Sequence, residues 1–168
     1  MRISLLVLMI FAGATTAFAS AKKNFAVSVP LKQFVEIFRS QLETQGSPVF
    51  PLWLKHCGEN SRVYCTFNSR EGLSISVSGD AVDGEIDLYS VQNQAGGLDP
   101  HASTPAIYAI IQLTNPDLTG KEINEGMLKL AESVFGDRKV YDTFETDKAI
   151  YRLGLSPIQG TIFTASPK

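Results

Sequence analysis

Apolar residues recur at helical spacing in the first part of the chain. Between Pro30 and Gln45 apolar side chains stand every three or four positions, and charged side chains occupy the positions between them. This period is typical of a helix that buries one face. Pro30 suits a first helical turn, and Gly46 with Pro48 favours an end at that point. We therefore predict a one-sided helix over 30–45.

The pattern changes to strict alternation further along the chain. Leu73, Ile75 and Val77 alternate with serines, the period of a strand with one buried face and one face of hydroxyl groups. Turn-forming residues separate several similar runs, and strands are predicted over 62–68, 73–78, 85–92, 140–145, 149–154 and 160–163. The first three of these strands predict an antiparallel meander.

Two further helical patterns stand between the two groups of strands. Thr104–Pro105 opens an apolar stretch that ends at Asn115–Pro116, and this stretch predicts a buried helix. Thr119 and Glu122 form a capping-box pattern ahead of an amphipathic stretch that ends at Gly136. The order predicts an α+β fold, with a mainly antiparallel sheet packed by about three helices. One joined sheet and two separate sheets both fit this order.

The start of the chain has the order of an export signal. Arg2 precedes an apolar stretch over 5–11, and small residues follow up to Ala17 and Ala19. We expect a cleaved signal peptide over 1–19 and a single α+β domain over 20–168. The first cysteine is Cys57, so we expect no bacterial lipid anchor and no stable membrane anchor after cleavage. The expected location is the periplasm or the extracellular medium.

Composition and charge restrict the classes of partner. The chain of 168 residues is 44% hydrophobic and 19% charged, which suits a folded domain and excludes a disordered class. Fifteen Lys and Arg face 17 Asp and Glu, a net charge of −2, and no basic run occurs. Polyanion binding needs a basic surface, so nucleic acid is not an expected partner. We expect another envelope or secreted protein as the partner and leave the oligomeric state open.

The two cysteines lie eight positions apart in the chain. Cys57 and Cys65 predict a disulfide, because an exported chain meets an oxidising compartment. His56 and His101 leave a hydrolase that uses Cys57 or His101 as an alternative, but a nucleophilic cysteine must stay reduced. The spacing of these four residues lacks the paired short intervals of a zinc site.

A cluster of acidic residues lies between Asp80 and Asp87. Hard cations such as calcium bind several carboxylate oxygens, so this cluster invites a calcium interpretation. Only Asp80 and Asp83 precede Gly84, whereas a calcium loop places ligands at three alternate positions before its glycine. We therefore favour a hairpin turn here, and we expect no metal and no cofactor.

The remaining candidates form two unusual segments. Residues 47–54 hold several large apolar side chains and two prolines, so this extended segment either covers the core or offers a docking surface. A polar loop is predicted from Gln92 to Ser103. The candidate binding residues from both segments are Phe50, Trp53, Asn93, Gln94, Asp99 and His101.

Taken together, these patterns favour a small exported protein that binds and does not catalyse. An inhibitor, an immunity-type protein and an envelope-accessory factor all fit this description. The alternatives are a periplasmic or secreted hydrolase that uses Cys57 or His101, and a secreted effector directed at a host.

Overall fold

A computed structural model describes residues 24–47, 51–59, 62–69, 72–81, 83–93, 100–156 and 160–168. The signal peptide predicted over 1–19 lies outside these residues, as do Phe50, Gln94 and Asp99 among the candidate binding residues. The division into a signal and one domain therefore stays a prediction.

The described elements alternate between helical and extended groups along the chain. Their order is η1 (Leu31–Gln33), α1 (Phe34–Thr44), β1 (Trp53–Glu59), β2 (Val63–Asn68), β3 (Leu73–Gly79), β4 (Ile86–Asn93), α2 (Pro100–Thr114), α3 (Gly120–Ala131), η2 (Glu132–Gly136), β5 (Tyr141–Glu145), β6 (Ala149–Ser156) and β7 (Gly160–Pro167). The three helices and the two groups of strands confirm the predicted α+β fold.

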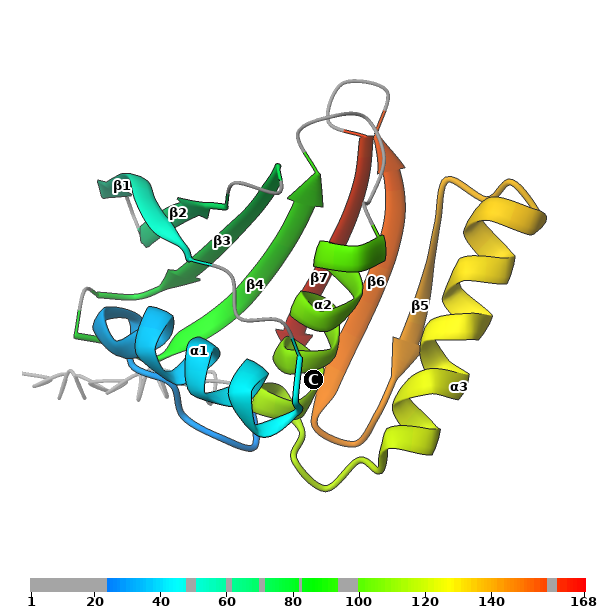
Figure 1. The fold of residues 1–168 in the computed structure, drawn as a ribbon, viewed down its shortest axis with the longest axis horizontal. Helices are drawn as coiled ribbons and strands as arrows, with labels where there is room; N and C mark the ends of the chain where they lie inside the picture. The colour runs from blue at the N-terminus through cyan, green and yellow to red at the C-terminus, as the bar shows by residue number, and fades with distance from the viewer. Residues whose placement is uncertain are drawn as a thin grey trace, which may run out of the picture.

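All seven strands belong to one sheet. Its strand order is β1-β2-β3-β4-β7-β6-β5, and each neighbouring pair is antiparallel. Strands β4 and β7 join the two groups, which settles the choice between one sheet and two. The edges of the sheet are β1 and β5, at the two sides of Figure 1.

The three helices pack on the same face of this sheet (Figure 1). Helix α1 points Phe34 into the core, where its ring meets those of Phe67 and Tyr89. Helix α2 contacts β4 and β7, and α3 contacts β5 and β6. The approach of α3 is close: a Cβ atom on Gly126 would stand 2.7 Å from the Phe144 ring. The helices thus cover one face of the sheet except at the edge strand β1, where six of seven residues are exposed.

The buried polar groups of this core are partly paired across elements. The hydroxyl of Thr114 at the end of α2 lies 2.9 Å from the hydroxyl of Tyr151 on β6. Burial raises the pKa of Tyr151 to about 12, against the opposing effect of this hydrogen bond. Tyr151 therefore stays neutral and ties α2 to the sheet at physiological pH.

Several predicted bounds differ from the structure; strand β7, for example, ends at Pro167 and not at Phe163. Helix α2 begins at Pro100 and not at Thr104, so Pro105 lies inside the helix, and because β4 ends at Asn93 the stretch predicted as a loop is six residues shorter. Either proline suits a first turn, because neither has an N–H to leave unpaired there. The first group also has four strands and not three, because Trp53–Glu59 pairs with β2 as the edge strand β1. No helix in the described ranges is long and apolar enough to cross a membrane.

Candidate functional site

The face of the sheet opposite the helices is the most distinctive surface of the described structure. Strand β2 alternates buried and more exposed side chains, and β7 does the same. Residues that lie directly opposite each other in antiparallel strands share a face, so the pairing register shows which side chains meet there. No described helix packs on this side (Figure 1), and we call it the open face.

One row of residues on the open face crosses all seven strands and ends on an aromatic residue at each side. In spatial order the row is Trp53, Asn68, Ser74, Gln92, Ile162, Gly154 and Tyr141. Trp53 is 45% exposed and Tyr141 is 57% exposed. With strands spaced about 4.8 Å apart, the row spans about 29 Å from β1 to β5, measured along the sheet.

The adjacent row is polar throughout. It consists of His56, Thr66, Ser76, Ser90, Thr164, Arg152 and Thr143, again with one residue from each strand. The hydroxyls of Thr66 and Ser76 lie 2.9 Å apart. This row is therefore small, neutral and polar from Thr66 to Thr164, whereas Tyr64 and Leu88 elsewhere on the open face are 39% and 38% exposed.

A shallow groove of about 200 Å³ is hollowed into the open face at β5, β6 and β7. Gly154 has no side chain, and the groove lies over it, between Tyr141 and Ile162 of the same row. Val140 is 70% exposed and Leu155 is 40% exposed at its rim. By alternation Val140 and Leu155 belong to the other side of the sheet from Tyr141 and Gly154, so they contribute only to the rim of the groove.

Arg152 brings a positive charge to the edge of this groove. Its guanidinium carbon lies 5.1 Å from the centre of the Tyr141 ring, a cation–π contact. In the described structure every salt bridge is made by other residues, so no described carboxylate neutralises Arg152. Thr143 and Thr164 lie opposite Arg152 on the two neighbouring strands. We call Tyr141, Arg152 and Ile162 the arginine–tyrosine patch.

Strand β5, which carries Tyr141, is held in place by Asp142. The Asp142 carboxylate accepts hydrogen bonds from the Ser133 hydroxyl at 2.5 Å, the Lys139 ammonium at 3.1 Å and the Thr143 backbone N–H at 2.8 Å. These bonds, that of Ser133 first, lower the pKa of Asp142 to about 2. The bond to Thr143 also occupies an N–H group at this edge of the sheet, which protects the edge from pairing with another strand.

The other edge carries the predicted disulfide. Cys57 on β1 and Cys65 on β2 are bonded, with their Cα atoms 4.1 Å apart. Both cysteines of the chain are therefore oxidised, and the hydrolase alternative loses the thiol of Cys57 as a nucleophile. His56 lies beside Tyr64, with its Nε2 atom 3.4 Å from the hydroxyl.

Two carboxylates of the acidic cluster are paired with basic side chains. Asp83 pairs with Lys32 at 2.8 Å, and Asp87 pairs with Arg62. Among the residues that the structure describes, no group of three or more His, Cys, Asp or Glu side chains could hold a metal ion. The turn interpretation fits the hydrogen bond from the Gly84 N–H to the Ala81 carbonyl at 2.9 Å.

The candidate binding residues are placed only in part. Trp53 begins β1 and stands exposed on the open face, so it does not cover the core. Asn93 ends β4 and His101 is the second residue of α2, and the structure describes the backbone but not the side chain of each. A common surface for Trp53 and the loop residues stays a prediction.

Sequence reasoning missed the arginine–tyrosine patch. Tyr141 and Arg152 are eleven positions apart and meet only through the register of β5 and β6. The one signal in the sequence is alternation: Arg152 and Gly154 occupy the solvent positions of a strand whose buried positions are Tyr151 and Leu153.

Comparison with known proteins brings no further information. No family model matches the chain, and neither a curated protein nor a solved structure is similar to it. The functional argument therefore depends on the geometry of this chain alone.

Proposed function

We propose that this chain is a small exported protein that binds another protein through the open face and does not catalyse a reaction. The observation that carries the proposal is the placement of its exposed anchors. Trp53 stands at one end of a cross-strand row, and Tyr141 with Arg152 stands at the other end. Trp, Tyr and Arg are the residue types that most often dominate the binding energy of protein interfaces.

The chemistry of the arginine–tyrosine patch defines which side chains of the partner contact it. An apolar side chain of the partner fills the groove over Gly154, between Tyr141 and Ile162. A carboxylate next to it pairs with Arg152, whose planar guanidinium binds carboxylates with two parallel hydrogen bonds. The partner segment therefore carries an acidic residue beside an apolar one.

The dimensions of the open face suit a protein and not a small ligand. The row from Trp53 to Tyr141 is about 29 Å long, and a standard interface covers about 800 Å² on each partner. The small polar residues between the two ends allow close approach without a charged group to desolvate. The interface thus has two anchoring ends joined by a row of small polar side chains.

Export is the second part of the proposal. The disulfide between Cys57 and Cys65 and the signal-like first residues both support it. The partner is then another envelope or secreted protein. An inhibitor, an immunity-type protein or an envelope-accessory factor would each work through such a contact surface.

The test is a quantitative capture experiment with the tagged mature chain and an envelope extract of its own source. Wild type is compared with Arg152→Ala and Tyr141→Ala, and Phe135→Ala is the matched control, because Phe135 is 53% exposed on the helical side of the molecule. We expect a protein that wild type and Phe135→Ala retain equally. Each patch variant should weaken its binding by about 2 kcal/mol or more, or roughly 30-fold.

Two results would contradict the proposal. Equal capture by all four proteins would place the interface elsewhere. A loss confined to Phe135→Ala would place it on the helical side. Circular dichroism of each variant shows whether a loss of binding comes from a loss of folding.

A further inference from the structure

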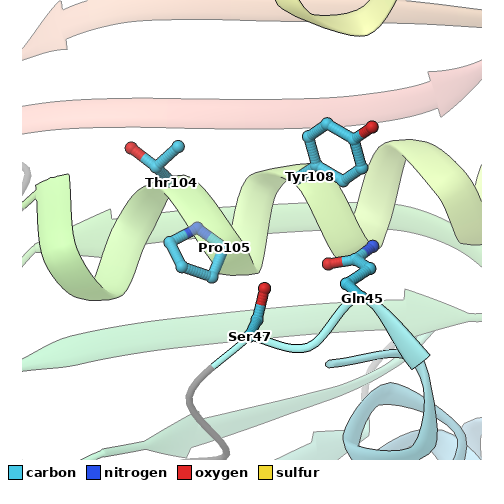
Figure 2. A pocket seen from close by; sticks show the side chains of 5 residues that line it. All are labelled: Gln45, Ser47, Thr104, Pro105 and Tyr108. Carbon is cyan, nitrogen blue, oxygen red and sulfur yellow. The ribbon is translucent and has the colours of Figure 1, made fainter. Parts of the chain in front are cut away.

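Strand β1 forms one edge of the sheet and is open on its outer side. Six of its seven residues are exposed, and β2 is the only described strand that pairs with it. Two hollows of the described structure lie elsewhere: the groove over Gly154, and a cavity of about 330 Å³ between the end of α1 and α2, which Figure 2 shows. What β1 offers a partner is therefore its edge and not a pocket.

The backbone groups of Cys57 point to this open side. Opposite residues of antiparallel strands either exchange backbone hydrogen bonds, with Cα atoms about 5.5 Å apart, or make none, with Cα atoms about 4.5 Å apart. The Cα atoms of Cys57 and Cys65 are 4.1 Å apart, so this pair is of the second kind. The N–H and C=O of Cys57 then point away from β2, as do those of Glu59 two residues on. No described backbone group pairs with either residue on that side.

The opposite edge of the sheet is less open. On β5 the N–H of Thr143 donates to the Asp142 carboxylate at 2.8 Å, so a strand that adds to β5 has to displace this bond. Pairing of β1 with β5 of the next copy would also build an open-ended chain of molecules. Pairing of β1 with β1 closes after two copies, because both copies use the same surface.

Two charged side chains of β1 match a second copy of the same strand. Lys55 and Glu59 are exposed and stand two positions before and two positions after Cys57. Every salt bridge of the described structure is made by other residues. When two antiparallel copies of β1 pair about a two-fold axis at Cys57, Lys55 of each copy lies opposite Glu59 of the other. Two ion pairs then form, and the two Cys57 residues exchange their free backbone hydrogen bonds.

The bulge in β1 makes this edge selective. The pairing register with β2 shifts between Leu54 and His56, so Lys55 is the extra residue of the strand. A bulge and a lysine both discourage an edge strand from pairing with unrelated chains. A second copy removes the obstacle of the charge, because it brings Glu59 opposite Lys55. The edge therefore admits its own copy in preference to a strand without a matching acidic residue.

We infer that the chain forms a two-fold symmetric dimer in which β1 of each copy pairs with β1 of the other about Cys57. The pairing joins the two seven-stranded sheets into one continuous sheet. The added strand lies in the plane of the sheet and leaves the open face uncovered. The dimer is thus independent of the proposed protein interface, and each can be contradicted alone.

Sedimentation velocity of the purified protein, from micromolar to millimolar concentration, tests the dimer. Wild type should associate to a dimer. Lys55→Glu and Glu59→Lys should each raise the dissociation constant about tenfold or more, because each replaces two opposite-charge pairs with two like-charge pairs. An equal mixture of the two variants should form a dimer again, since every pair then has opposite charges. Lys129→Glu on α3 is the matched control and should dimerise as wild type does.

A wild-type protein that stays a monomer over the whole concentration range would overturn the inference. Charge reversals that leave the dissociation constant unchanged would show that the copies meet elsewhere. A mixture of the two variants that does not regain the dimer would contradict the pairing of Lys55 with Glu59.

Amide hydrogen exchange locates the contact between the copies. The N–H groups of Cys57 and Glu59 should be protected at high protein concentration only, because they are free in the monomer. The Gly58 N–H points to β2 and should be protected at every concentration, which makes it the internal control. Exchange of the Cys57 N–H that does not depend on concentration would overturn the inference.

Discussion

The guanidinium of Arg152 lies over the ring of Tyr141, 5.1 Å from its centre, on a face of the sheet that no described helix covers. This contact holds two long side chains in one arrangement before a partner arrives. Side chains that are ordered in advance lose less entropy on binding. The arginine–tyrosine patch is therefore organised in the free protein, as an interface anchor should be.

Trp53→Ala and Tyr141→Ala should barely change the stability of the fold. Both side chains are exposed, at 45% and 57%, so truncation leaves no cavity in the core. We expect the free energy of unfolding to fall by less than about 1 kcal/mol in each variant. Phe163→Ala is the control, because the Phe163 side chain is fully buried, and it should cost about 3–5 kcal/mol. Urea unfolding of the four proteins measures these differences. A large loss of unfolding free energy in Trp53→Ala would show that the Trp53 side chain packs in the core.

The double variant Cys57→Ser, Cys65→Ser should fold and be less stable. The disulfide closes a loop of eight positions, and the chain-entropy relation assigns such a loop about 2.5 kcal/mol. The core is built mainly from other strands and helices, so it forms without this bond. Urea unfolding with and without reductant checks the size of the effect. Failure of the double variant to fold at all would show that the core depends on the bond between β1 and β2.

Asp142→Asn should make the fold less sensitive to acid. The pKa of Asp142 is lowered from 3.8 to about 2 in the folded protein, chiefly by the hydrogen bond from Ser133. A carboxyl whose folded pKa is lowered stabilises the fold above its unfolded pKa and loses this effect as the pH falls through the folded pKa. The stability difference between wild type and Asp142→Asn should therefore be constant above about pH 5 and shrink between about pH 4 and pH 2. A constant difference over that whole interval would contradict the assigned bonds.

Export should remove residues 1–19 and leave Ser20 as the first residue of the mature chain. Ala17 and Ala19 supply the small side chains that a signal peptidase recognises. Intact-mass measurement of the protein recovered outside the cytoplasm determines the new end. Recovery of the full chain of 168 residues from membranes would show that the first residues act as an anchor.

The helices and most strands could be predicted because their signals are local. The capping box of Thr119 and Glu122 is present at the start of α3, with the Glu122 carboxylate 2.8 Å from the Thr119 N–H. Leu73, Ile75 and Val77 alternate with serines and lie in β3, where the serine hydroxyl groups face the open face. Each of these patterns depends on neighbours within one turn or one strand.

Strand β1 could not be predicted, because its sequence lacks the alternation that burial imposes. Six of its seven residues are exposed, so no apolar position marks a buried face. The strand exists because the edge of β2 offers backbone partners and because Cys57 is bonded to Cys65. Both causes are tertiary interactions, which the local sequence of β1 does not show.

The arginine–tyrosine patch was beyond prediction for a related reason. Tyr141 and Arg152 belong to different strands, and a register shift of one residue would place either side chain on the helical face. Only the observed pairing of Tyr141 with Gly154 brings the aromatic ring, the guanidinium and the groove together.

Site-specific photo-crosslinking in living cells tests the open-face interface most directly. A photoreactive phenylalanine derivative replaces Trp53, Tyr141 or the control Phe135, one position at a time. The account predicts that positions 53 and 141 crosslink to the same exported protein and that position 135 does not. A protein crosslinked from position 135 but from neither 53 nor 141 would contradict it, and would place the partner on the helices and not on the sheet.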